Sequence, residues 1–101
     1  HDVHRLAQAD LIFYNGLHLE GKISEVLSQM QRFACSVAIS DGLEKTMLRQ
    51  TSATTFDPHI WFDICLWIQA AEFICTQLQA IDPKNSDSYR INTKKYCAHL
   101  E

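Results

Sequence analysis

The chain has 101 residues, enough for one small domain, and 47% of them are hydrophobic while 21% are charged. This balance predicts a packed globular domain and excludes a disordered chain. The net charge is −3 and the nine Lys and Arg residues are scattered, which excludes a basic stripe, so we expect no nucleic-acid partner. The apolar stretches at 9–14 and 60–68 are shorter than the roughly 20 residues of a membrane-spanning helix, so we expect no transmembrane segment.

The first half of the chain predicts helices and strands in alternation. Residues 2–9 have the spacing of a short helix, and the apolar run at 11–14 stops at an Asn-Gly pair, which is typical of a buried parallel strand leading into a turn. An amphipathic helix is predicted from Leu19 onward. A second apolar run at 35–39 is followed by Ser-Asp-Gly, residues that favour turns and loops. Strand, helix and strand in this order predict a parallel βαβ unit with a right-handed crossover.

The second half predicts a long loop and then two helices. Residues 41–56 show no periodicity, which indicates a loop or a loop with a short helical turn. Apolar residues at steps of three and four predict a helix over 64–80, with Asp63 as its N-cap. An Asp-Pro pair ends that helix, and Ser86 or Asp87 would cap a last helix that runs to the end of the chain. The fold class is therefore α/β, a small parallel sheet flanked by helices.

Four cysteines are spread along the chain without a Cys-x-x-Cys pair, so a zinc ribbon or a thioredoxin-type motif is not supported. In a continuous helix Cys65 and Cys75 would lie about 15 Å apart, too far to bridge to each other. We interpret the four as buried free thiols. A pairing of Cys75 with Cys97 between neighbouring helices stays open.

The heptapeptide 57–63, Asp-Pro-His-Ile-Trp-Phe-Asp, carries the candidate chemistry. A His on a polar loop, restricted by a neighbouring Pro and leading into a helix, suits ligation of Zn²⁺, Mn²⁺ or Fe²⁺. His59 is therefore the candidate metal ligand, although a lone loop His is most often an ordinary surface residue. Asp57 and Asp63 are interpreted as loop and cap hydrogen-bonding groups and not as an acid–base pair.

Two motifs together resemble one family. Residues 57–61 resemble the Asp-Pro-His-x-Trp motif of the zinc, manganese and iron receptors of bacterial ABC transporters, the TroA/PsaA-like family. Residues 10–20, Asp-Leu-Ile-Phe-Tyr-Asn-Gly-Leu-His-Leu-Glu, resemble the same family's strand, Asn-Gly turn and Leu-Glu helix start. The motifs stand in the family's order with the family's elements between them, and the resemblance extends from residue 2 to about residue 96.

The resemblance implies that residues 1–101 are part of the N-terminal lobe of a two-lobed periplasmic-binding-type receptor, and that residues 85–101 begin the interlobe helix. In the family, a His at the position of His59 is one of four metal ligands. The others are an earlier Asp-Pro-His histidine, a third His, and an Asp or Glu, the last two in the C-terminal lobe. Three further histidines do not match ligand positions: His1, His4 and His18. One ligand of four, completed by water, would bind metal weakly or not at all.

The function that the resemblance implies is extracytoplasmic capture of Mn²⁺, Zn²⁺ or Fe²⁺ as the transported ligand, with no reaction catalysed. The implied partners are an ABC transporter permease and the C-terminal lobe of the same receptor. The implied location is periplasmic or extracytoplasmic, with or without a lipid anchor. Zinc-specific members often carry a His-rich insertion before the second ligand, and residues 41–56 contain no His, which favours manganese, iron, or a zinc receptor without that insertion.

Two other functions stay open. A metalloenzyme would use His59 for a catalytic metal and Asp57 or Asp63 as base, and it needs a nearby second His or carboxylate cluster that the sequence does not show. A surface adhesin or interaction lobe would bind its partner whether or not His59 is present. Trp61, Phe62 and Trp67 are predicted to pack in the core or between lobes and not to form an aromatic ligand box.

Overall fold

The computed structural model describes residues 5, 8–17, 19–21, 25–26 and 35–101. Two strands, β1 (Leu11–Tyr14) and β2 (Cys35–Ala38), pair in parallel with Leu11 opposite Cys35. This pairing confirms the predicted parallel sheet, and together with the helices described below it confirms the α/β class. The connection between the strands lies largely outside the described residues, as does the helix predicted over 2–9. The helix predicted from Leu19 onward does not begin there, because residues 19–21 form a turn; Glu25 and Val26 are helical.

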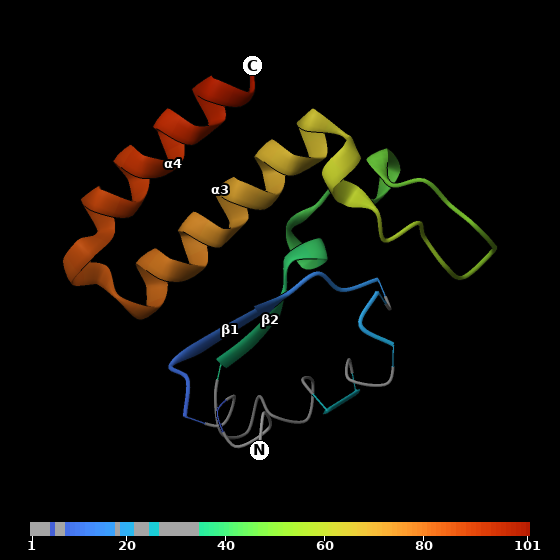
Figure 1. The fold of residues 1–101 in the computed structure, drawn as a ribbon, viewed down its shortest axis with the longest axis horizontal. Coiled ribbons are helices and arrows are strands. Elements are labelled where there is room, and N and C mark those ends of the chain that lie inside the picture. Colours follow the sequence, from blue (N-terminus) through green and yellow to red (C-terminus); the bar gives the residue numbers. More distant parts are fainter. Residues whose placement is uncertain (1–4, 6–7, 18, 22–24, 27–34) are drawn as a thin grey trace.

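The second strand is one residue shorter than predicted, because Ile39 begins a 3-10 turn, η2 (Ile39–Gly42). This turn follows the sheet and packs against the first long helix, residues 64–81 (Figure 1). Gly42 lies against the ring of Phe73, and a Cβ at this position would collide with that ring. The absent side chain therefore allows the turn and the helix to approach closely.

The predicted long loop contains a short helical turn and a small hairpin. The turn is η3 (Lys45–Met47). Beyond it, Gln50 and Phe56 form an isolated antiparallel bridge, and the backbone N–H of Thr51 donates to the carbonyl of Thr55 at 3.0 Å. The bridge brings the two ends of the exposed segment 51–55 together, just before the candidate ligand loop.

Helix α3 (Ile64–Ile81) begins and ends within one residue of the prediction. Its N-cap is Asp63, whose carboxylate accepts a hydrogen bond from the backbone N–H of Leu66 at 3.2 Å, as predicted. The helix buries Leu66, Ala70 and Cys75, whereas Ile64 at its start is 55% exposed. The buried face thus begins at Leu66, two residues after the position that the apolar spacing indicates.

Helix α4 (Ser86–Leu100) follows after the short turn η5 (Pro83–Asn85) and lies beside α3 as an antiparallel hairpin (Figure 1). Neither Ser86 nor Asp87 caps α4, so that prediction is wrong. Asp82 organises the corner instead: its carboxylate accepts from Asn85 Nδ2 at 2.9 Å and from the Tyr89 hydroxyl at 2.6 Å. A carboxylate preceding the turn can bind two donors at once, and this takes the place of a cap within the helix.

The hydrophobic core lies between α3 and the segment 39–62 that contains the 3-10 turns. Its buried members come from the loop, the ligand segment and the helix: Leu43, Leu48, Ile60, Leu66 and Ala70. Four half-buried residues pack around them: Leu17, Ile39, Phe56 and Trp67. The candidate ligand segment is therefore attached directly to the core.

The cysteines only partly follow the prediction. Among the described side chains, Cys75 is a buried free thiol, Cys97 is half-buried and free, and Cys65 is exposed, which corrects the expectation that it is buried. Burial raises the pKa of the Cys97 thiol, and the nearby charge of Glu72 acts in the same direction. The Cys97 thiol is therefore not activated as a nucleophile.

Helix α3 is longer than the apolar stretches at 9–14 and 60–68, which are too short to cross a membrane. It has 18 residues and is apolar enough, by length and composition, to do so. One such helix is weak evidence for a membrane span, because the core helix of a soluble protein can have the same length and composition.

Replacing Asp63 by Ala should destabilise the protein by about 1 kcal/mol, within a range of roughly 0.5–2 kcal/mol, because the first turn of α3 loses its cap. Urea denaturation followed by circular dichroism measures this change. Asp63→Asn, which keeps a capping oxygen, is the matched control and should stay close to the parent. Equal stability of Asp63→Ala and the parent would show that the cap does not contribute.

Asp82, at the corner between α3 and α4, should make the free energy of unfolding depend on pH. Hydrogen bonds from Asn85, and then from Tyr89, lower the pKa of Asp82 below its usual value. Because the folded-state pKa is the lower one, the contribution is complete above the unfolded-state pKa of about 3.9 and is lost as the pH falls through the folded-state value. The stability difference between the parent and Asp82→Asn, measured by urea denaturation at a series of pH values, should therefore narrow below about pH 4. A difference independent of pH would contradict this assignment.

Candidate metal centre

Two hydrogen bonds to other segments hold the loop that carries His59. The backbone N–H of Asp57 donates to the carbonyl of Arg49 at 2.6 Å, which joins the loop to the base of the small hairpin. From the end of β1, the side-chain amide of Asn15 donates to the carbonyl of Pro58 at 2.9 Å. The residues on either side of this contact are 43 positions apart, so the loop is tied to the sheet as well as to its own neighbours.

His59 is the central residue of a tight turn. Its backbone angles are φ −80° and ψ 62°, and the backbone N–H of Ile60 donates to the carbonyl of Pro58 at 2.9 Å. These values describe an inverse γ-turn. Immediately after it, the short turn η4 (Ile60–Phe62) directs Ile60 into the core, where it is only 1% exposed. The buried residue that follows His59 therefore anchors the turn.

Asp57 orients the imidazole of His59. One carboxylate oxygen, Oδ1, accepts the backbone N–H of His59 at 3.0 Å and lies 2.6 Å from ring Nδ1. The hydrogen bond from that backbone N–H lowers the pKa of the Asp57 carboxyl, and the ring contact adds to the effect. Since an ionised carboxylate only accepts, Nδ1 carries the proton and the lone pair resides on Nε2.

The ring of His59 is half exposed and borders two aromatic rings. Its side chain is 50% exposed, its centroid lies 5.2 Å from that of Trp61 in an edge-on arrangement, and 6.2 Å from that of Phe62 in a stacked arrangement. Trp61 is 41% exposed and Phe62 is 79% exposed. Of the two predicted alternatives, these residues do not pack in the core, and packing between lobes stays a prediction. Trp67 packs against the core as expected.

Nε2 of His59 is the atom available to a ligand. Within the described residues it makes no hydrogen bond, and these residues contain no group of three His, Cys, Asp or Glu side chains arranged to hold a metal ion. Asp63 is engaged at the start of α3 and Asp57 at Nδ1. The part of the chain that the structure describes can therefore offer one imidazole nitrogen, oriented by a carboxylate, to a metal.

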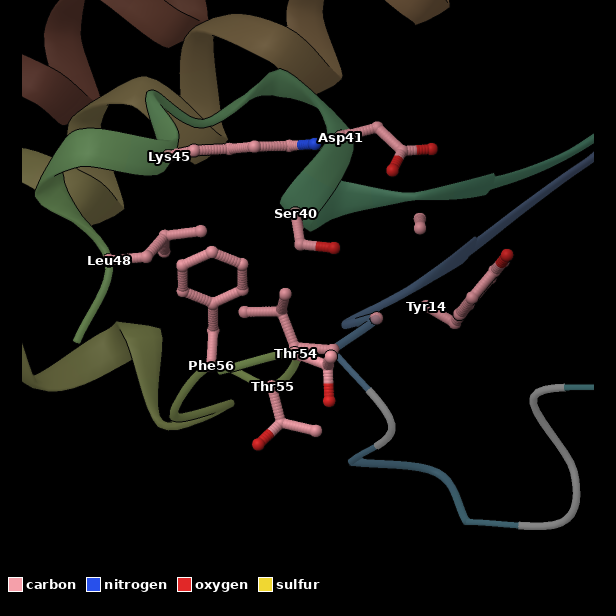
Figure 2. A pocket seen from close by; sticks show the side chains of 11 residues that line it. Tyr14, Ser40, Asp41, Lys45, Leu48, Thr54, Thr55 and Phe56 are labelled. Atoms are coloured by element: carbon pink, nitrogen blue, oxygen red, sulfur yellow. The ribbon is translucent and has the colours of Figure 1, made fainter. Parts of the chain in front are cut away.

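A separate cavity of about 540 Å³ lies at the carboxyl ends of both strands (Figure 2). Figure 2 shows Tyr14 of β1 on one side and Leu48 and Phe56 on the other, with Ser40 between them. Neither His59 nor Asp57 lines it. The cavity occupies the usual ligand position of a parallel sheet, and the chain runs on from Phe56 in its lining to the candidate ligand loop.

The sequence identified His59 as the candidate ligand and Asp57 as a loop hydrogen-bonding group, and the structure brings these two together. It did not identify Asn15 as a contact of the loop. The Asn-Gly pair indicated a turn, and nothing in the local sequence showed that the amide reaches Pro58. The histidines at positions 1, 4 and 18 lie outside the described residues.

Comparisons with known proteins agree on one family. The sequence profile described as zinc-uptake complex component A, periplasmic (ZnuA), matches residues 1–101. The chain is 39% identical to the manganese-binding lipoprotein MntA of Bacillus subtilis (strain 168) over 99% of its length and 33% of that protein. It is 36% identical to the iron ABC transporter substrate-binding lipoprotein MtsA of Streptococcus pyogenes serotype M1, over 99% of this chain and 34% of that protein.

The fold agrees with a solved structure of the same kind. The periplasmic zinc-binding protein TroA from Treponema pallidum superposes with a TM-score of 0.92 and 34% identity, over 98% of this chain and 36% of that chain. The chain thus spans about a third of the length of the relatives it matches. The resemblance seen in the two motifs is confirmed along the whole chain, which belongs to the family of periplasmic zinc-uptake components, ZnuA, with its TroA-like relatives.

Proposed function

We propose that this chain contributes to an extracytoplasmic receptor that captures a divalent transition metal and delivers it to an ABC transporter, and that His59 binds this metal through Nε2. The metal is cargo, so the role is binding and release and not catalysis. The names of the relatives that match the chain refer to substrate-binding lipoproteins and to periplasmic metal-binding proteins, which supports this reading.

The contact between Asp57 and His59 is the observation that carries the proposal. A metal-binding His generally donates its other ring N–H to a carboxylate, which selects the tautomer and raises the basicity of the ligating nitrogen. The 2.6 Å contact of Nδ1 with Asp57 has this arrangement. A His that served only as a surface residue would not need a carboxylate, a γ-turn and a buried neighbour to orient it.

The cargo that fits this donor is a first-row divalent ion. Neutral imidazole is a good ligand for zinc and iron and is also found with manganese. The relatives are named for manganese, iron and zinc, so the proposal covers Mn²⁺, Zn²⁺ and Fe²⁺. The remaining ligands would determine the choice among them, because geometry and ligand type set selectivity more than one imidazole does.

The partners and the place of action follow from the same proposal. A permease of an ABC transporter would receive the metal, and a second lobe of the receptor would supply the ligands that complete the site. Residues 85–101 would begin the helix that joins the lobes, and the exposed Trp61 and Phe62 would face the second lobe. A periplasmic or lipid-anchored extracytoplasmic location accords with the names of the relatives.

Replacing His59 by Ala in the full product of the reading frame that encodes this chain should weaken binding of Zn²⁺ or Mn²⁺ by more than about 100-fold. Removing a group that only orients a ligand lowers metal affinity by roughly 10- to 100-fold, and removing the ligand itself should lower the affinity further. Isothermal titration calorimetry and metal analysis of the purified protein measure this. His99→Ala, an exposed His of α4, is the matched control and should bind as the parent does. Unchanged affinity in His59→Ala would overturn the proposal.

Replacing Asp57 by Asn in the same protein should weaken metal binding by about 10- to 100-fold, because the imidazole loses the carboxylate that orients it. The same titrations apply, and Asp87→Asn, at an exposed position of α4, is the control. If Asp57→Asn and Asp87→Asn bound metal equally well, Asp57 would have no part in the site.

The 101-residue chain by itself should bind Zn²⁺ only weakly, without a tight stoichiometric phase in a titration. One protein nitrogen with water completing the shell lacks the several ligands in fixed geometry that tight sites use. A competition titration with a zinc-sensitive chelating dye measures this. Tight binding of one zinc ion by the 101-residue chain would show that it contains a ligand set of its own.

A further inference from the structure

The turn after β1 is closed by a carboxylate. Glu20 accepts the backbone N–H of Asn15 at 2.7 Å and the backbone N–H of Gly16 at 3.1 Å. The two N–H groups converge on this one carboxylate, and the turn continues with positive φ at Gly16 (86°) and at Leu17 (53°). A pair of converging N–H groups of this kind favours an anionic partner, and Glu20 supplies that partner from within the same turn.

Asn15 is held on both sides of its backbone. Its N–H is bound by Glu20, and its carbonyl accepts the backbone N–H of Ser40 at 3.0 Å. Restraint at both the N–H and the carbonyl fixes the backbone of Asn15 and therefore the direction in which its Cα–Cβ bond points. Its side-chain amide consequently points across to the candidate metal loop, where Nδ2 donates to the carbonyl of Pro58 at 2.9 Å.

The Pro58 carbonyl is the point at which this chain of contacts reaches the metal ligand. It accepts Asn15 Nδ2 and also the N–H of Ile60, the bond that closes the γ-turn around His59. One oxygen thus joins the end of β1 to the turn that sets the direction of the imidazole. Asp57 orients the ring within the loop, and Asn15 places the loop relative to the sheet.

We propose that Glu20 and Asn15 are positioning residues for metal binding: Glu20 restrains Asn15, and Asn15 holds the carbonyl of Pro58 so that Nε2 of His59 faces the metal. The inference rests on the proposed function, because it assumes that His59 is a ligand. It extends that function by assigning a role to two residues that do not bind metal themselves. Glu20 lies 39 positions and Asn15 lies 44 positions before His59 in the sequence.

The test uses Glu20→Gln and Asn15→Asp in the full product of the reading frame. Glu20→Gln keeps the size but replaces one acceptor by an amide, and Asn15→Asp removes the donor to Pro58. Each should weaken Zn²⁺ or Mn²⁺ binding by roughly tenfold, the lower end of the range for groups that orient a ligand. Since both act through one path, the double variant should lose less than the product of the two single losses.

Cobalt absorption separates a positioning role from a merely structural one. Co²⁺ bound in place of the native metal gives visible bands that depend on ligand geometry, and these bands should shift in both variants at a temperature where circular dichroism shows them folded. Glu25→Gln and Asn92→Ala are matched controls, because both residues are exposed. They should retain the affinity and the cobalt spectrum of the parent.

The outcomes distinguish a failure of the positioning role from a failure of the proposed function. Loss of stability with unchanged metal affinity and an unchanged cobalt spectrum in Glu20→Gln and Asn15→Asp would overturn the positioning role. If His59→Ala still lost metal binding in that case, the proposed function would stand. If His59→Ala bound metal as the parent does, the proposed function itself would fail, and the positioning role would fail with it.

Discussion

The burial of Ile60 is the constraint on which the candidate site depends. This residue is 1% exposed and belongs to the same core cluster as Leu43, Leu48 and Leu66. Full burial of an Ile side chain is worth about 1.5–3 kcal/mol, whereas a hydrogen bond such as those in the loop contributes about 0.5–1.5 kcal/mol. The apolar anchor therefore determines where the loop is attached, and the polar contacts determine how His59 is oriented.

The orientation of His59 has a local part and a long-range part, and only the local part could be predicted from the sequence. Asp57 and His59 are two positions apart, so an Asx-type contact between them follows from ordinary turn chemistry. The contact of Asn15 with Pro58 depends instead on the parallel pairing of β1 and β2 and on the path of η2. Such a contact requires the tertiary structure, because the Asn-Gly pair has the same local sequence whether or not its amide reaches another segment.

The strands, both long helices and the cap at Asp63 were predictable because each has a periodic or chemical signal that acts over a few residues. The exposure of Trp61 and Ile64 has one physical cause, the change from 3-10 to α-helical geometry at Asp63. Helical spacing extended backwards through this point predicts a buried Trp61 and Ile64, whereas the 3-10 turn buries Ile60 and leaves those two exposed. A change of helical period alters which side chains face the core, and the sequence carries no clear mark of it.

The bridge between Gln50 and Phe56 separates the tip of the long loop from the metal segment. The chain enters and leaves the tip at this one pair, and the tip is closed on itself by contacts of Thr51 and Ser52 with Thr55. Lengthening a loop whose ends are already joined costs little free energy, since doubling it adds only about 0.6 kcal/mol. The length and composition of this tip can therefore change while the bridge keeps the position of the imidazole unaltered.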